Sequence, residues 1–231
     1  MQRPPPQRLL AEALGTFGLV AVGTGAMLLE GGRSGWLGAV GIALSFGLVV
    51  VAMVLIFGRA SGAHINPAVT FAAFSAGLIA RRDVLPYMLA QCVGAIAASA
   101  LLAVWAAPGS ALGATLPAVP LAAAFAIEVG VTGLLVYVIL RVISRPDATL
   151  PRIAWRVGAT VSLLAFVSGP ATGASMNPAR SLGPALVSGN VSALWLYLIA
   201  PVLGAWLAVQ ACKRSAGAAC FESVNSSEPC R

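Results

Sequence analysis

The chain carries the stretch Ser61-Gly62-Ala63-His64-Ile65-Asn66-Pro67-Ala68 and repeats its pattern as Thr172-Gly173-Ala174-Ser175-Met176-Asn177-Pro178-Ala179. Both stretches consist of Ser or Thr, then Gly-Ala, two variable residues, and Asn-Pro-Ala. Each lies among long apolar runs. Two matched stretches in this setting predict two half-sites that face each other inside a membrane.

The composition indicates a lipid environment. Hydrophobic residues make up 59% of the chain and charged residues 9%. This composition has too few polar residues to cover a water-exposed surface. About 20 apolar residues are needed to cross roughly 30 Å of hydrocarbon. Six runs approach or exceed that length: 9–30, 36–57, 84–107, 118–142, 153–169 and 191–212. The chain is therefore predicted to be an all-α membrane protein with six transmembrane helices, of which the fifth is the shortest.

The basic residues predict the orientation in the membrane. Six spans place both termini on one side, and almost all the basic residues then lie on that side: Arg3, Arg8, Arg59, Arg81, Arg82, Arg141, Arg145, Arg152, Arg156, Lys213, Arg214 and Arg231. Only Arg33 and Arg180 lie opposite. Loops rich in Lys and Arg remain in the cytoplasm, so both termini are predicted to be cytoplasmic, in a plasma or inner membrane. The same bias explains the net charge of +7, and no nucleic-acid partner is predicted.

The chain divides into two halves of three spans each. Glu12 lies in the first span of one half and Glu128 in the first span of the other, and each repeated stretch follows the second span of its half. Because three is odd, the two halves enter the membrane from opposite faces, as in the inverted repeats of transport proteins. We expect one repeat over residues 1–107, a second over 108–212, and a disordered cytoplasmic tail over 213–231 that contains Cys220 and Cys230.

The segments after the two Asn-Pro-Ala boxes are apolar but too short to span. Each allows roughly eleven residues of helix, about 16 Å, so two that enter from opposite faces would meet near the midplane. Asn is a favoured N-cap and Pro a favoured first helical residue. Re-entrant half-helices are therefore predicted from Pro67 to about Gly77 and from Pro178 to about Ser188, with their positive dipole ends converging.

The approaches to these half-helices are predicted to be non-helical. A non-helical backbone at membrane depth is tolerated where it lines a wet cavity. We expect its carbonyl groups to form a ladder of acceptors along a pore, with the amides of Asn66 and Asn177 as donors at the centre. The residues of this ladder and of the cytoplasmic mouth are Gly62, Ala63, His64, Ile65, Gly173, Ser175 and Met176.

Glu12 and Glu128 lie inside spans, where a carboxylate is expensive and is by default a functional candidate. They could carry protons in a coupled transporter. Their equivalent positions in the two halves favour another role, in which each accepts hydrogen bonds from the backbone of its own half's loop. We therefore predict that each carboxylate lies within about 3.2 Å of a backbone N–H of that loop.

Taken together, these residues resemble the aquaporin, or major intrinsic protein, family. The resemblance rests on the paired boxes Asn66-Pro67-Ala68 and Asn177-Pro178-Ala179, on Arg180 directly after the second box, on the two glutamates, and on six spans plus two half-helices over about residues 8–212. It implies a homotetramer with one pore per subunit, passive flux, and exclusion of protons and ions. Two converging helix dipoles and one fixed cation would repel a proton independently of that resemblance.

The resemblance also implies a selectivity filter near the outer mouth. By spacing from the boxes, its four positions fall on Phe46, Ala165, Ala174 and Arg180. Water-specific members place a histidine at the position of Ala165, whereas the only histidine of this chain is His64. Small side chains at two positions predict a filter that is wide enough for glycerol.

The residues around the second box are most similar to the nodulin-26-like branch and its bacterial relatives. Ser181 follows Arg180 where glycerol facilitators have an aspartate. The branch passes water, glycerol and uncharged hydroxides such as boric or arsenous acid. The sequence alone leaves other interpretations open for single residues: Phe46 could face lipid, Ala165 and Ala174 could serve helix packing, and His64 could be a hydrogen-bonding loop residue or a pH gate.

The preferred hypothesis is a passive channel for water and small neutral solutes. The alternatives are a water-selective channel and an ion-coupled transporter. Coupling requires a titratable or ion-binding cluster at the midplane, and the sequence places two asparagines there. With one histidine and no catalytic or metal-ligand spacing, neither an enzyme, nor a cofactor, nor a metal site is predicted.

Overall fold

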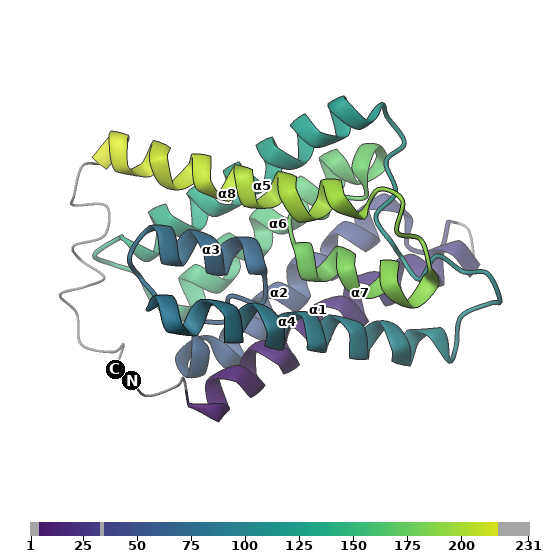
Figure 1. Ribbon diagram of the computed structural model, residues 1–231, viewed down its shortest axis with the longest axis horizontal. Helices are drawn as coiled ribbons and strands as arrows, with labels where there is room; N and C mark the ends of the chain where they lie inside the picture. Colours follow the sequence, from purple (N-terminus) through teal and green to yellow (C-terminus); the bar gives the residue numbers. More distant parts are fainter. Residues whose placement is uncertain (1–4, 33–34, 217–231) are drawn as a thin grey trace.

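A computed structural model describes residues 5–32 and 35–216 of the chain. This part of the chain is all-helical, with two short helices set among six long ones (Figure 1). The helices are α1 (Pro6–Gly32), α2 (Gly38–Ser61), α3 (Pro67–Ser75), α4 (Arg81–Ala103), α5 (Leu121–Ile143), α6 (Leu150–Thr172), α7 (Pro178–Ser188) and α8 (Leu194–Ala216). The six long helices are long and apolar enough to cross a membrane, and α3 and α7 are the two half-helices that the sequence predicts.

The helix ends differ from those of the predicted runs, most clearly in α6, α4 and α8. Helix α6 has 23 residues and extends beyond the predicted run 153–169 at both ends. Its first turn includes Arg152 with an exposed side chain, and at its other end the helix continues through Pro170 to Thr172. Helix α4 begins at Arg81 and ends at Ala103, before the turn at Pro108-Gly109. Helix α8 continues to Ala216, beyond the predicted end of the second repeat, and residues 217–231 of the tail lie outside the described residues.

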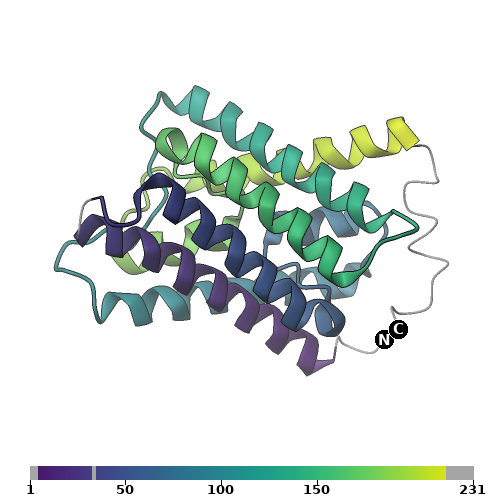
Figure 2. The ribbon, with the colours of Figure 1, turned by 180° about the vertical axis from the view of Figure 1, so that it is seen from behind.

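The two halves pack around each other. Helices α2 and α6, the second spans of their halves, lie side by side (Figure 2), and α1 packs on α4 as α5 packs on α8. The crossing of α2 and α6 depends on two glycines: a Cβ added at Gly47 would lie 2.5 Å from the carbonyl oxygen of Gly158, and one added at Gly158 would lie 2.6 Å from that of Gly47. Small residues permit such close helix contact in a membrane.

Replacing Gly158 with alanine is expected to destabilise the fold. The new methyl group meets backbone of α2, which cannot move aside without separating the helices, and overpacking of this kind costs about 1–3 kcal/mol. We expect the thermal midpoint in detergent to fall by roughly 5 °C. Gly130→Ala is the matched control, because a Cβ at Gly130 meets nothing within 4 Å. Equal midpoints for the two variants would contradict this account of the crossing.

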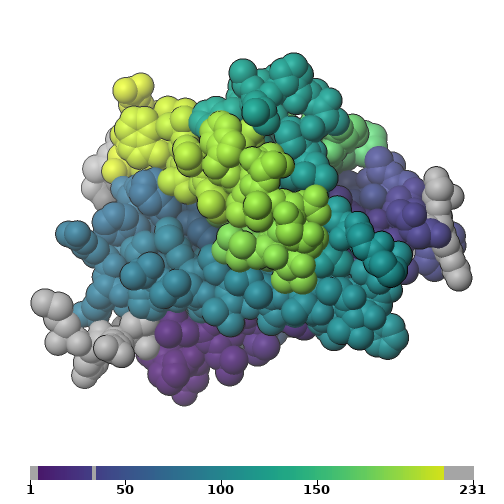
Figure 3. Space-filling model, turned by 45° about the vertical axis from the view of Figure 1, so that its right-hand side comes forward, coloured from purple at the N-terminus to yellow at the C-terminus, as the bar shows by residue number. Residues whose placement is uncertain are grey.

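The outer surface suits a lipid environment. Helices α4 and α8 lie at the surface in Figure 3, and both carry large exposed apolar side chains, such as Leu85, Val93 and Ile199. Two exposed tryptophans, Trp36 before α2 and Trp105 just after α4, lie near helix ends, as expected where a protein meets the membrane–water interface. Buried polar side chains, among them Glu12, Asn66, Glu128, Asn177 and Arg180, are instead gathered around the two half-helices.

Candidate functional site

The half-helices begin at the two asparagines. The side chain of Asn66 caps α3 by accepting a hydrogen bond from the backbone N–H of Ala68 at 2.8 Å, and Asn177 caps α7 by accepting from Ala179 at 3.0 Å. A proline is the first residue of each helix. The sequence pattern Asn-Pro thus produces two helix N-termini that contact each other, and their dipoles place positive potential at the same point.

The same asparagines join the two loops. Asn66 Nδ2 donates to the carbonyl oxygen of Met176 at 2.7 Å, and Asn177 Nδ2 donates to that of Ile65 at 2.9 Å. Each carboxamide nitrogen carries two hydrogens, so one remains for a molecule in the pore. The midplane is therefore a fixed pair of donors.

The loop backbone adopts the same strained conformation twice. The residues with positive φ before α3 are Gly62, Ala63 and Ile65, and those before α7 are Gly173, Ala174 and Met176. A residue other than glycine in this region costs on the order of 1–3 kcal/mol. The prediction of non-helical approaches is thus confirmed, and the strain requires compensation elsewhere.

The buried carboxylate of Glu12 supplies part of that compensation in the first half. It accepts hydrogen bonds from the backbone N–H of His64 at 2.9 Å and of Ile65 at 2.7 Å, and from the hydroxyl of Ser61 at 2.7 Å. Gln91 on α4 donates to it at 2.7 Å. Glu12 is fully buried, so water does not satisfy these loop N–H groups.

Glu128 repeats the arrangement in the second half. It accepts from the backbone N–H of Ser175 and of Met176, both at 2.9 Å, and from the hydroxyl of Thr172 at 2.7 Å. The predicted contacts of both glutamates with their own loops are confirmed at these distances. Neither carboxylate lines the cavity described below.

Two tyrosines, which sequence reasoning missed, also hold the loops. Tyr87 on α4 donates to the carbonyl oxygen of Ser61 at 3.1 Å, and Tyr197 on α8 donates to that of Thr172 at 2.6 Å. Their signal in the sequence is positional, because each lies in the third span of its half. Each tyrosine hydroxyl group satisfies a carbonyl group at the end of a helix.

His64 belongs to a hydrogen-bonded pair that also repeats. Its Nδ1 lies 3.2 Å from Thr70 Oγ1, and at the matching positions of the second half the hydroxyl groups of Ser175 and Ser181 are hydrogen-bonded. Thr70 also accepts from Gln91 at 2.9 Å. The ring of His64 faces the pore and contacts Tyr87, with the ring centroids 5.5 Å apart.

The four predicted filter residues all line one cavity. The Cζ atom of Arg180 lies 5.1 Å from the centroid of the Phe46 ring, and Ala165 and Ala174 line the same space. Arg180 Nη1 donates to the carbonyl oxygen of Gly113 at 2.7 Å. Gly113 lies in the α4–α5 connection and was not predicted from the sequence, because a backbone carbonyl group leaves no residue signature.

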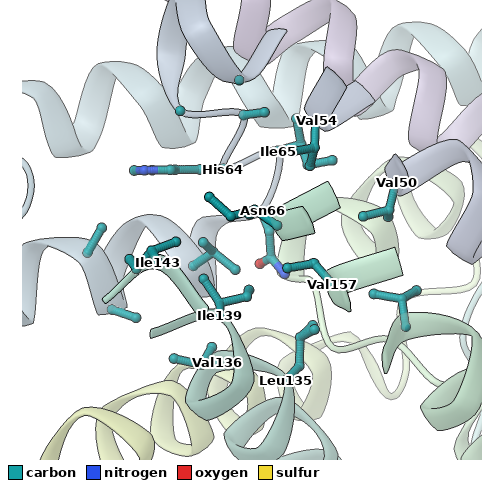
Figure 4. Close-up of a pocket in the computed structure, with 18 of the residues that line it drawn as sticks. Val50, Val54, His64, Ile65, Asn66, Leu135, Val136, Ile139, Ile143 and Val157 are labelled. Atoms are coloured by element: carbon teal, nitrogen blue, oxygen red, sulfur yellow. The ribbon is translucent and has the colours of Figure 1, made fainter. Parts of the chain in front are cut away.

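The cavity has a volume of about 670 Å³ and runs from Phe46 and Arg180 to Arg145 beyond the end of α5. Figure 4 shows Val50, Val54 and Val157 from the spans, and His64 and Asn66 from the loop, around this space. Loop residues from Gly62 to Ile65 and from Ala174 to Met176 line it. Gly173 does not, and Pro67, Ala68, Pro178 and Ala179 lie buried behind the lining.

A family model described as major intrinsic protein matches residues 4–211 of the chain. The chain belongs to the major intrinsic protein family. It is 40% identical over 200 residues to Aquaporin NIP1-1 of Zea mays, covering 86% of this chain and 71% of that protein. It is 38% identical to Nodulin-26 of Glycine max, with 86% and 74% covered.

The fold agrees with this membership. The X-ray structure of the aquaglyceroporin from Plasmodium falciparum matches with a TM-score of 0.82 and 25% identity, covering 91% of this chain and 96% of that one. As a family member, the chain is a multi-pass membrane channel for water and small neutral solutes. Within residues 5–32 and 35–216, no group of His, Cys, Asp and Glu side chains is placed to hold a metal ion.

Proposed function

We propose that this channel passes glycerol, and uncharged metalloid hydroxides such as boric or arsenous acid, together with water. The observation that carries the proposal is that Phe46, Ala165, Ala174 and Arg180 line one end of the cavity together. The ring of Phe46 offers an apolar wall for carbon, and Arg180 offers hydrogen-bond donors for hydroxyl groups. The two alanines leave room between them.

Arg180 has a donor left for such a solute. Its Nη1 is held by Gly113 and its Nη2 lies 3.0 Å from Met27 Sδ, whereas its buried Nε has no hydrogen-bond partner among the residues that the structure describes. An unpaired buried donor costs about 1–3 kcal/mol. Because Nε is buried, a solute hydroxyl group in the pore would accept instead from the second hydrogen of Nη1 or of Nη2, of which Gly113 and Met27 each engage only one.

The inner half of the pore is proposed to exchange hydration for backbone contacts. The loop carbonyl groups provide acceptors, and the spare hydrogens of Asn66 and Asn177 provide donors, while the opposite wall is made of Val54, Val157 and other apolar side chains. A small polyol thus finds hydrogen bonds on one side only. Flux is passive in this proposal, because among the residues that the structure describes the cavity-lining side chains at the meeting point of α3 and α7 are Asn66 and Asn177, neither of which titrates.

We further propose that both ends of the chain face the cytoplasm of a plasma or inner membrane, and that four copies assemble into a homotetramer. The end of α5 and the beginnings of α4 and α6 carry Arg141, Arg81 and Arg152 at the same end of the molecule as the beginning of α1 and the end of α8 (Figure 1). The positive-inside rule favours that orientation. The tetramer is inferred from family membership.

The Ala165→His variant tests the filter. An imidazole adds bulk and a polar group opposite Phe46 and Arg180, so glycerol flux into proteoliposomes should fall at least tenfold while water flux falls less than threefold. Stopped-flow light scattering measures both rates. Gly169→Ala, one turn along α6, is the control, because its new methyl group meets nothing within 4 Å.

Two results would reject this assignment. Equal loss of both fluxes in Ala165→His would mean that the side chain does not face the filter. No glycerol flux through the parent protein would favour the water-selective alternative, and a flux that depends on a proton or sodium gradient would favour a coupled transporter.

A further inference from the structure

The Phe46 ring lies directly against the backbone of α1 at Gly23. A Cβ added at Gly23 would lie 2.5 Å from Phe46 Cδ1 and 2.6 Å from its Cζ, where a real side chain cannot lie without moving the ring. Glycine weakens the interior of a helix, and Gly23 lies deep within α1. The space that it leaves is filled by the aromatic ring.

Arg180 also contacts this ring. Its Cζ lies 5.1 Å from the ring centroid, so Phe46 contacts both the α1 backbone and a guanidinium group. Both side chains are at least nine-tenths buried. Because the ring packs against the α1 backbone and also lines the cavity, we expect a ring that is pushed away from α1 to move into the cavity.

Met27 brings α1 into contact with the second large filter residue. It lies four residues after Gly23 and hence on the same face of α1. Its Sδ lies 3.0 Å from Arg180 Nη2, and a thioether is a weak acceptor. One face of α1 thus contacts both side chains that bound the opening, although neither residue belongs to the four filter positions.

We infer that Gly23 and Met27 are specificity-determining residues: Gly23 lets the Phe46 ring withdraw from the pore, and Met27 holds the guanidinium group of Arg180 on the α1 side. This inference rests on the proposed filter and adds to it two residues of α1 that position Phe46 and Arg180. The width available to a polyol is then determined by α1. A side chain at position 23 converts the pore from one that passes glycerol to one that favours water.

The Gly23→Ala variant is the principal test. Its methyl group displaces the Phe46 ring towards the cavity, so glycerol flux in proteoliposomes should fall at least fivefold while water flux changes less than twofold. Gly25→Ala is the matched control on the same helix, because its Cβ meets only Leu102 Cδ2, at an ordinary 3.6 Å. Boric acid flux should follow glycerol flux.

A double variant separates filter geometry from a general effect on folding. In Gly23→Ala/Phe46→Leu the smaller side chain no longer fills the space over position 23, so the glycerol-to-water ratio should return to within twofold of the parent value. Met27→Leu keeps the size but removes the acceptor, and should lower that ratio twofold to threefold with unchanged thermal stability. The rescue of Gly23→Ala by Phe46→Leu would be non-additive, which is the signature of residues in contact.

The outcomes distinguish this inference from the filter assignment. If Ala165→His lowers the glycerol-to-water ratio but Gly23→Ala does not, the filter stands and the role of Gly23 is wrong. If Gly23→Ala lowers both fluxes equally and Phe46→Leu gives no rescue, Gly23 serves helix packing alone and the inference is overturned. If neither Ala165→His nor Gly23→Ala changes the ratio, the filter assignment and the inference both fail.

Discussion

A Glu128→Ala variant is expected to lose most of its folded protein. Its carboxylate accepts the backbone N–H groups of Ser175 and Met176, and removing it leaves both without that acceptor at about 1–3 kcal/mol each. The positive φ angles of Ala174 and Met176 then lack the contacts that hold them. The total of about 4 kcal/mol is a large part of the stability of a typical domain.

The measurement is the yield of monodisperse protein in detergent and its thermal midpoint, which should fall by roughly 10 °C. Glu128→Gln should lose about half as much, because its amide oxygen still accepts one N–H while its NH₂ group faces the other. Glu30→Ala is the control: Glu30 also accepts three backbone N–H groups, from Gly35, Leu37 and Gly38, but it lies in the last turn of α1, at the end of the helix, where water can replace it. A midpoint of Glu128→Ala equal to that of Glu30→Ala would show that the second loop does not need its carboxylate.

The parts of the fold that follow from local sequence were predictable. Asn66-Pro67 and Asn177-Pro178 start helices because an asparagine side chain caps the N–H groups of a first turn and proline fits that turn without an N–H. The role of Glu12 and Glu128 followed from one requirement, that a carboxylate in hydrocarbon find donors, and the nearest unpaired donors lie in the loops. Repetition in both halves made each of these predictions stronger.

The parts that depend on packing between distant segments were not predictable. Gly113 contributes a carbonyl group from an irregular connection, and Gly23 contributes the absence of a side chain, so neither has a chemical signature. Gln91 reaches Glu12 and Thr70 from α4 and has no counterpart on α8, where Pro201 takes the equivalent place after Tyr197. Only the contacts between spans reveal such asymmetry.

An Arg180→Val variant is expected to admit cations. The guanidinium group is the one fixed positive side chain at the filter end of the described cavity, opposite the exposed Arg59 and Arg145 at its other mouth. A cation in the filter about 5 Å from the guanidinium group would be repelled by about 3 kcal/mol at an effective dielectric constant of 20. This repulsion lowers the occupancy of the filter by cations by roughly two orders of magnitude. The parent channel should therefore carry no detectable current. The variant should show at least a tenfold rise in proton leak, measured with a pH-sensitive dye inside proteoliposomes.

The rise should remain well below a hundredfold, because the dipoles of α3 and α7 still converge at Asn66 and Asn177 and oppose a cation at the midplane. Removing Arg180 also widens the filter, so glycerol flux should increase together with the leak, and continued water flux shows that the variant is folded. Arg59→Ala removes the same charge from an exposed mouth position, where water screens it, and should leave the leak unchanged. If Arg59→Ala and Arg180→Val leak equally, net charge of the pore determines exclusion. If neither leaks, the converging half-helices alone form the barrier.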